Sequence, residues 1–424
     1  MDFRPNNLII DTNKCILVRS GSTSALGSKA TMRSLKESID KCKDLSFDLN
    51  FTTAKNWKER DKNRVLIGYM PIYFPREIVH SVNGLAVGIL GAGDRKRIIK
   101  GDAFYQSYIC RIPRGIIELA LDKHFNRFDG FIFPSICDVM RNLSGMFQLL
   151  NIGTFDSYMD YPQNFDEKIG GEYFKNEINS ILANIKKINN VEVTAENLNH
   201  SIRLYNRNRK LISSIYDTRQ TYPWRLSAEE LYYIVRAGMV MPVEEHNEIL
   251  ETINYQMQLE SGEPMDKIRV IVSGSFCEQP PISLIKTIEQ AGCYVVDDDF
   301  LVGSRWIEGD IQDDTDDPIG AIVKAFLNKS TFSSSIYDIA NPKEKRLLEL
   351  FNRRKADGII FAAPSFCDPA LLDRPLLQNV CEKNNIRFIS FEYAENTGQF
   401  KNIKEQVGAF SDSIKLWPEE LIEN

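Results

Sequence analysis

The sequence predicts an α/β protein made of two doubly wound parallel-sheet lobes joined by a helical segment. Short apolar runs alternate with helical patterns in residues 63–164 and again in 263–424, which is typical of βαβ units. Between these stretches the pattern changes to long helices with apolar residues at helical spacing. Two of the short apolar runs also lead into the same Ser-x-Cys-Asp arrangement. The two lobes therefore look like a loose internal duplication.

The chain of 424 residues suggests two or three domains. The pattern divides it into an N-terminal helical extension with one amphipathic helix at 30–45, a first α/β lobe, a helical connecting segment and a second α/β lobe. The expected bounds are 1–62, 63–164, 165–262 and 263–424.

The first lobe is predicted to alternate strands and helices in order. The run from Pro71 leads into a helix, and Pro113 stands in the first turn of another helix, a position that suits proline. The predicted strands are 64–69, 85–90 and 131–133, the last followed by a helix.

The connecting segment and the second lobe continue the pattern. Ser227 and Glu230 form a capping box that opens a helix, and Gly238 can close it. Another helix is expected over 198–219. The second lobe then has predicted strands at 268–273, 294–296, 359–362 and 388–391, with a helix beginning near Ile319 among the helices between them.

Composition excludes several classes of protein. The net charge of −6 and the absence of a basic stripe with aromatic residues argue against a nucleic-acid partner. The first residues lack the features of a signal peptide, and no apolar run approaches the roughly 18 residues that span a membrane. We expect a cytoplasmic protein with no membrane partner, in which the eight cysteines are thiols or metal ligands.

Two cysteines stand where parallel α/β sheets place ligands. Cys137 and Cys367 each follow a predicted strand and precede a predicted helix, so both should lie at the carboxyl ends of strands. Asp138 and Asp368 are expected to be the N-caps. The helix dipole should lower the pKa of each thiol and favour the thiolate. Although a single buried cysteine is usually structural, the repeated arrangement favours ligands. With Cys110, they could hold an iron–sulfur cluster that leaves one iron open.

Longer motifs surround these cysteines. They read QSYICRIPR at 106–114, FPSICDVMRNLSGM at 133–146, APSFCDP at 363–369, and YAENTGQF at 393–400 followed by FSDSIKLW at 410–417. In these motifs the chain resembles the family of benzoyl-CoA reductases and 2-hydroxyacyl-CoA dehydratases. It is most similar to the B-type, cluster-binding subunits of ATP-dependent benzoyl-CoA reductases. The resemblance runs from about residue 69 to residue 417.

The resemblance implies a cofactor, a reaction and partners. It implies one 4Fe-4S cluster bound by Cys110, Cys137 and Cys367. It also implies reduction of benzoyl-CoA to a cyclic dienoyl-CoA by single-electron steps. The implied partners are an acyl-CoA substrate, a homologous cluster-bearing subunit and ATP-hydrolysing activator subunits that donate electrons. The chain has no P-loop or dinucleotide-binding glycine pattern, so it would depend on such an activator.

Two other functions stay open. The same fold would serve as a subunit of a (R)-2-hydroxyacyl-CoA dehydratase, in which one electron is recycled. A non-catalytic electron-transfer or maturation module is the third possibility. The sequence leaves undecided which acyl group is used, which homologous subunit binds substrate, and which group donates protons.

The remaining cysteines are interpreted separately. Cys277 follows the strand 268–273 and is the strongest rival ligand. The other four are expected to be structural, and they are Cys15, Cys42, Cys293 and Cys381.

Other features favour ordinary structural roles. The glycines of 88–93 fit a turn better than a phosphate loop, and the acidic run 310–317 fits a solvated loop. No spacing of the histidines suggests ligands, and they are His80, His124, His200 and His246. A second set of polar residues follows cysteines or strand ends and is expected on helix surfaces or strand caps rather than at substrate, namely Arg141, Asn142, Glu392, Glu395 and Asn396.

Overall fold

The computed structural model describes residues 34–274, 281–300, 304–331, 335–394 and 399–416. Its strands are β1 (Val65–Tyr69), β2 (Gly84–Gly88), β3 (Gly130–Pro134), β4 (Phe155–Met159), β5 (Ile268–Ser273), β6 (Cys293–Asp298), β7 (Gly358–Pro364) and β8 (Phe388–Tyr393).

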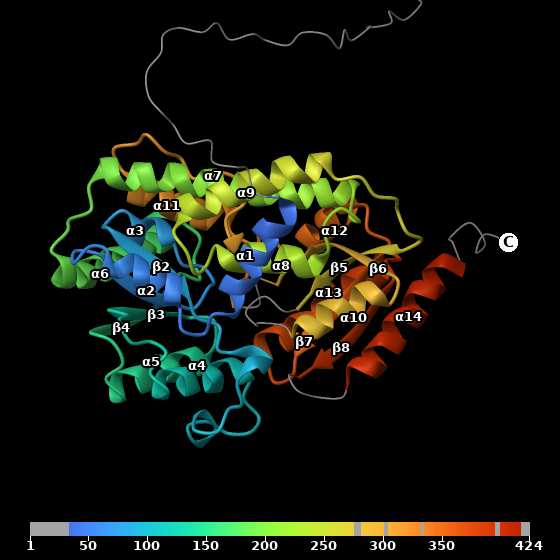
Figure 1. Ribbon diagram of the computed structural model, residues 1–424, viewed down its shortest axis with the longest axis horizontal. Helices are drawn as coiled ribbons and strands as arrows, with labels where there is room; N and C mark the ends of the chain where they lie inside the picture. Colours follow the sequence, from blue (N-terminus) through green and yellow to red (C-terminus); the bar gives the residue numbers. More distant parts are fainter. Residues whose placement is uncertain (1–33, 275–280, 301–303, 332–334, 395–398, 417–424) are drawn as a thin grey trace, which may run out of the picture. The chain divides into compact units, whose positions relative to one another are not determined.

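The helices lie between and after these strands (Figure 1). In the first half they are α1 (Leu35–Phe47), α2 (Thr52–Glu59), α3 (Arg76–His80), α4 (Arg111–Leu121) and α5 (Asp138–Leu149), with short η1 (Gly93–Arg95) and η2 (Gly101–Ala103). The later ones are η3 (Glu167–Gly171), α6 (Glu172–Asn189), α7 (Ala195–Thr221), α8 (Ala228–Ala237), α9 (Val243–Leu259), α10 (Ile282–Gln290), α11 (Pro318–Lys329), α12 (Lys343–Arg354), α13 (Asp368–Lys383) and α14 (Phe400–Leu416).

The strands form two four-stranded parallel sheets with equivalent strand orders. The first sheet has the order β2-β1-β3-β4 and the second β6-β5-β7-β8. This confirms the predicted α/β class with two doubly wound parallel sheets. In each sheet the strand order reverses beside the first strand, so β1 lies between β2 and β3, and β5 between β6 and β7. The carboxyl ends of such neighbouring strands flank the crevice where open α/β sheets bind ligands.

Strand β4 was not predicted. Its sequence FDSYM is polar at alternate positions and mostly half-buried, whereas the predicted strands are runs of buried apolar residues, as in β1 and β7. Close packing explains one glycine of β1: a Cβ atom on Gly68 would lie 2.5 Å from the Phe131 ring. Glycine at this position lets the Phe131 ring lie against the neighbouring strand.

The helices agree with the signals read from the sequence. Ser227 and Glu230 form the expected capping box at the start of α8, and Gly238 is its C-cap. The amphipathic helix expected at 30–45 is α1, which begins later, after a capping box made by Ser34. Helices α7 and α9 pack side by side (Figure 1).

Helix α7 is bonded to segments of both halves of the chain. The Arg209 guanidinium lies 2.7 Å from the carboxylate of Glu77 in α3. The Asn206 side chain donates to the carbonyl oxygen of Ile311 at 2.8 Å and accepts from its amide at 2.9 Å. The helical segment therefore joins elements of the two sheets, as expected, while the bounds of the four proposed domains stay a prediction.

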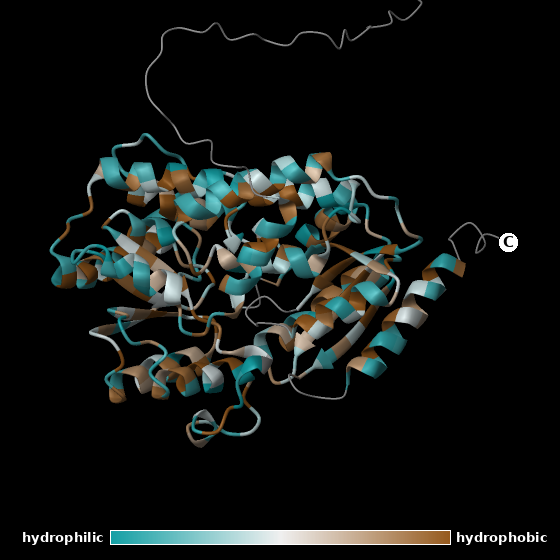
Figure 2. Ribbon diagram, in the orientation of Figure 1, coloured by the Kyte–Doolittle hydropathy of each residue, from teal (hydrophilic) through white to brown (hydrophobic). Residues whose placement is uncertain are grey.

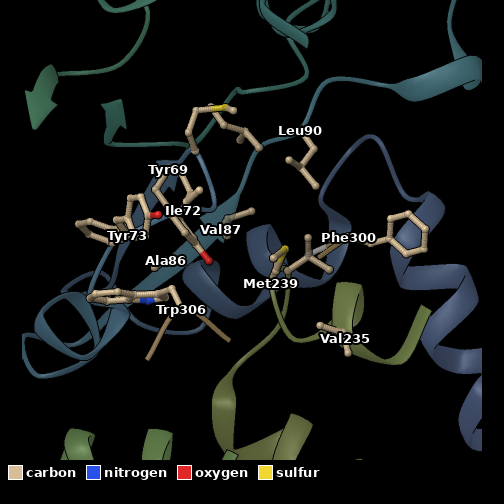
Figure 3. Close-up of a cluster of buried hydrophobic side chains, with 14 of the residues drawn as sticks. Tyr69, Ile72, Tyr73, Ala86, Val87, Leu90, Val235, Met239, Phe300 and Trp306 are labelled. Atoms are coloured by element: carbon tan, nitrogen blue, oxygen red, sulfur yellow. The ribbon is translucent and has the colours of Figure 1, made fainter. Parts of the chain in front are cut away.

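One large hydrophobic core includes residues from both sheets. Figure 2 shows that the strands are largely hydrophobic and that the outer helices carry both hydrophobic and hydrophilic residues. In Figure 3, Tyr73 after β1 lies beside Trp306 after β6, and their ring centroids are 6.2 Å apart. Among the described residues, no helix combines the length and apolar character needed to cross a membrane.

Candidate functional site

Cys137 lies at the carboxyl end of β3. The amide of Ser135 donates to the carbonyl oxygen of Met159 at 2.9 Å, which ties the loop after β3 to the end of β4. Cys137 is the N-cap of α5. Backbone N–H groups of Met140 and Val139 donate to its thiol.

Cys367 occupies the equivalent position in the second sheet. The amide of Ser365 donates to the carbonyl oxygen of Tyr393 at 2.8 Å, which ties the loop after β7 to the end of β8. Cys367 is the N-cap of α13. Phe366, directly before it, has φ of 66° and is 51% exposed. A bulky residue in this conformation is strained, and such strain clusters at functional sites.

The expectation that Asp138 and Asp368 are the N-caps was wrong by one residue. Both are the first residues of their helices, and the cysteines themselves are the caps. The physical reason is the bend of the chain, which places the last non-helical residue at cysteine. Each aspartate still stands in the first turn, where its negative charge favours the helix dipole.

Cys110 is also a helix N-cap, at the start of α4. Glu118 of α4 accepts hydrogen bonds from the amides of Ile99, Lys100 and Gly101 at 2.9, 2.6 and 2.8 Å. Burial alone would raise the pKa of Glu118, but these three amides hold it below its usual value. The carboxylate therefore fixes the segment upstream of Cys110 against the helix that Cys110 caps.

Electrostatic coupling shows which of these thiols are neighbours. The negative charge of Cys367 contributes to raising the pKa of Cys137. Tyr105 feels the charges of both Cys110 and Cys137. The Ser335 hydroxyl also donates to the carbonyl oxygen of Ile136 at 2.8 Å, so a segment that follows the second sheet's α11 reaches the Cys137 loop.

The expected lowering of the thiol pKa was wrong for Cys137. Burial raises its pKa, and this outweighs the opposite effect of the two amides at the start of α5. The helix terminus was visible in the sequence, but the burial of the thiol was not.

The structure also tests the other cysteines and the metal-binding groups. Cys42, Cys293 and Cys381 are buried, and burial raises their pKa values to about 12, 12 and 11, which confirms their structural role. Cys277 and Cys15 lie outside the described residues. Among the described residues, no three His, Cys, Asp or Glu side chains are grouped as ligands of one metal ion.

The features given ordinary roles mostly have them. Arg141 and Asn142 are exposed on α5, and exposed Glu392 pairs with Arg374 at 3.6 Å. Glu395 and Asn396 lie outside the described residues. The glycine run after β2 forms turns, and the acidic run is a loop whose last residue, Asp317, caps α11.

A cavity that the sequence did not predict lies at the carboxyl edge of the second sheet. It has a volume of about 630 Å³ and reaches from the ends of β5 and β6 to α7 and α12. A smaller cavity of about 130 Å³ shares Ser273, Asp299 and Arg346 with it and extends to Ala363 and Ala370 on either side of Cys367. It therefore lies between the ends of β5 and β7, where the strand order reverses.

Two neighbouring carboxyl groups line the large cavity. Asp297 lies 2.6 Å from Arg354 and 3.3 Å from Arg305, and Asp298 accepts from the Tyr216 hydroxyl at 3.1 Å. Burial opposes ionisation of both. The two arginines nevertheless hold the pKa of Asp297 below its usual value, whereas burial raises that of Asp298. The run of three aspartates after β6 was the available signal, but the arginines come from distant segments.

Comparisons with known proteins agree with the arrangement of these elements. The family described as "2-hydroxyglutaryl-CoA dehydratase, D-component" matches residues 71–414. The chain is 47% identical to a benzoyl-CoA reductase subunit of Thauera aromatica over 380 residues, which is 89% of this chain and 98% of that protein. It is 24% identical to the (R)-phenyllactyl-CoA dehydratase beta subunit of Clostridium sporogenes, over 82% of this chain and 91% of that protein. It is 23% identical to the (R)-2-hydroxyglutaryl-CoA dehydratase beta subunit of Acidaminococcus fermentans, over 84% and 94%.

Proposed function

The chain belongs to the family of the 2-hydroxyglutaryl-CoA dehydratase D-component, and on that premise we propose that it is the iron–sulfur subunit of an ATP-dependent benzoyl-CoA reductase. The family resemblance read from the cysteine motifs is confirmed. The observation that carries the choice of a reductase is the 47% identity to the benzoyl-CoA reductase subunit of Thauera aromatica, roughly twice the identity to the dehydratase subunits.

The proposed ligands of one 4Fe-4S cluster are Cys110, Cys137 and Cys367. All three are helix N-caps, and the charges of Cys137 and Cys367 influence one another. Thiolates are the usual ligands of such clusters, so the donor set fits. A cubane binds each thiolate through a different iron, and the three sulfur atoms therefore need not converge on one point. The proposed position is the cleft between the two lobes.

The protein residues have defined tasks in this proposal. A bound cluster would supply single electrons of low potential. The amides of Val139 and Met140 offset the negative charge of Cys137. The large core beneath the cysteine loops excludes water. The proposed reaction converts benzoyl-CoA to a cyclic dienoyl-CoA by single-electron steps.

The proposed partners follow from the same premise. They are a homologous cluster-bearing subunit and ATP-hydrolysing activator subunits, because the chain has no P-loop pattern of its own. We place the complex in the cytoplasm, where thiols stay reduced.

Activity of the complete complex tests the proposal. The protein is co-purified with its partners without oxygen and supplied with ATP and either benzoyl-CoA or a 2-hydroxyacyl-CoA. A reductase consumes ATP in proportion to the electrons delivered to benzoyl-CoA, and the isolated chain is inert. Turnover of many 2-hydroxyacyl-CoA molecules per ATP, with benzoyl-CoA untouched, contradicts the proposal.

Two alternatives are separated by the same experiment. The dehydratase subunits among the relatives favour a (R)-2-hydroxyacyl-CoA dehydratase as the second candidate, and the ratio of ATP to product distinguishes it. A non-catalytic electron-transfer or maturation module would bind no acyl-CoA. The cavity of about 630 Å³ at the second sheet lies within the range of small-molecule sites, which favours a chain that contacts a ligand.

A further inference from the structure

Tyr105 carries a buried hydroxyl that lacks a bonding partner. The residue lies in the segment between η2 and α4, five positions before Cys110. Within the described part of the chain, its oxygen is shielded from solvent and makes no hydrogen bond. Buried hydroxyl groups in proteins are nearly always bonded. An unbonded one beside a site indicates a ligand that would accept the bond.

The surroundings of Tyr105 identify that ligand. Burial raises the pKa of its hydroxyl, and the negative charges of Cys110 and Cys137 raise it further. The hydroxyl therefore keeps its proton and is available as a donor next to two of the three proposed ligand cysteines. Tyr105 also packs against the large hydrophobic core, which restricts its movement. A sulfur-containing anion between the two cysteines would satisfy the donor.

We propose that Tyr105 is a positioning residue for the iron–sulfur group, and that its hydroxyl donates a hydrogen bond to a sulfur atom of the cluster held by Cys110 and Cys137. This inference rests on the proposed function. Hydrogen bonds to cluster sulfurs stabilise the more negatively charged, reduced state and so raise the reduction potential. Tyr105 thereby adjusts the driving force for electron transfer without touching the substrate.

The same segment offers a matched control. Tyr108 is three residues further along and is 64% exposed. A Tyr108→Phe variant removes a hydroxyl of the same chemistry, in the same loop, from a side chain that faces solvent. Any effect common to both variants reflects the loop as a whole, and an effect limited to Tyr105→Phe reflects the buried hydroxyl.

The experiment compares wild type, Tyr105→Phe and Tyr108→Phe in the complete complex purified without oxygen. Iron content is measured first, and the cluster is then titrated by electron paramagnetic resonance against electrode potential. We expect equal iron in all three and a more negative midpoint potential in Tyr105→Phe alone. In the cluster-free protein, Tyr105→Phe should unfold at the same temperature or higher, because it removes an unbonded buried hydroxyl.

The outcomes separate the two proposals. If wild type binds no iron, the proposed function fails and the inference fails with it. If wild type binds the cluster and Tyr105→Phe has the wild-type potential, only the inference is overturned. A lower thermal stability of cluster-free Tyr105→Phe also counts against it, since the hydroxyl would then have a partner within the protein.

Discussion

Cys137 and Cys367 cap equivalent helices in two sheets of the same strand order. Each follows the third strand of its sheet along the chain, β3 or β7, and each lies two residues after a serine whose amide is bonded to the end of the fourth strand. Their thiols are also near enough for the charge of one to affect the pKa of the other. The internal duplication thus provides two of the proposed ligands by a single structural device, and Cys110 is the unpaired third.

Removing any one of the three proposed ligands should remove most of the iron. Wild type purified without oxygen should contain about four iron atoms per chain. Single changes of Cys110, Cys137 or Cys367 to Ala should lower this sharply, because a cubane loses a protein bond. Iron analysis and visible absorption measure the effect. Cys293→Ala, in buried β6, is the control, and equal losses in the control or zinc in place of iron would show that the site is misassigned.

Breaking the buried ion pair in the large cavity should destabilise the fold. The side chains of Arg354 and Asp297 are 5% and 4% exposed, so Arg354→Met leaves a buried carboxylate without its nearest cation. We expect a loss of about 3 kcal/mol in the free energy of unfolding, measured with urea. Lys345→Met on the same helix breaks an exposed pair with Glu349. Its cost should be below about 0.5 kcal/mol, and similar losses in both variants would contradict the role of burial.

His246 should make stability depend on pH in weak acid. Burial lowers its pKa to about 4. One ring nitrogen bonds the Asn208 amide at 2.9 Å and the other bonds the Ile234 carbonyl oxygen at 2.9 Å. In the unfolded chain its pKa is near 6.5, so below that pH the unfolded state binds the proton first. Stability contributed by neutral His246 is complete above about pH 6.5 and is lost as pH falls toward 4.

The measurement is the free energy of unfolding at pH 7 and pH 5. Wild type should lose about 2 kcal/mol from this residue over that interval. His246→Gln cannot take up the proton, so its stability should fall less steeply. Parallel pH profiles for the two proteins would mean that His246 is not buried in its neutral form.

Two glycine-to-alanine changes should have opposite effects. In Gly68→Ala the new Cβ meets the Phe131 ring inside the core, and overpacking of this kind costs about 1–3 kcal/mol. Gly145 lies in α5 with nothing within 4 Å of a new Cβ, so Gly145→Ala should stabilise the helix by about 0.5–1 kcal/mol. Thermal unfolding of the two variants measures both effects. A stabilising Gly68→Ala would mean that the two strands are packed less closely.

The strands with continuous apolar runs were predictable because both faces of a parallel sheet are buried. Strand β4 escaped because only its last residue, Met159, is buried. The caps were misplaced because aspartate is a common N-cap, and the sequence does not show where the chain bends. The direction of the Cys137 pKa depends on burial, a property of the folded chain.

The cavity and Tyr105 could not be predicted for a related reason. The charges around Asp297 come from Arg305 and Arg354, which lie on different elements. The importance of Tyr105 lies in a bond that it does not make within the described residues, and no motif encodes the absence of a bond. Sequence patterns indicated which cysteines to examine, and the three-dimensional arrangement identified the groups around them.

The position of the three caps also constrains the order of events during synthesis. Cys110 and Cys137 belong to the first half of the chain, whereas Cys367 follows β7, after the connecting helices and most of the second sheet. A nascent chain therefore presents two proposed ligands to the cell long before the third has left the ribosome. Iron delivered at that stage would meet an incomplete set of thiols. Cofactor loading should consequently be a late, post-translational step, accessible only to chains that have already folded their carboxyl-terminal sheet.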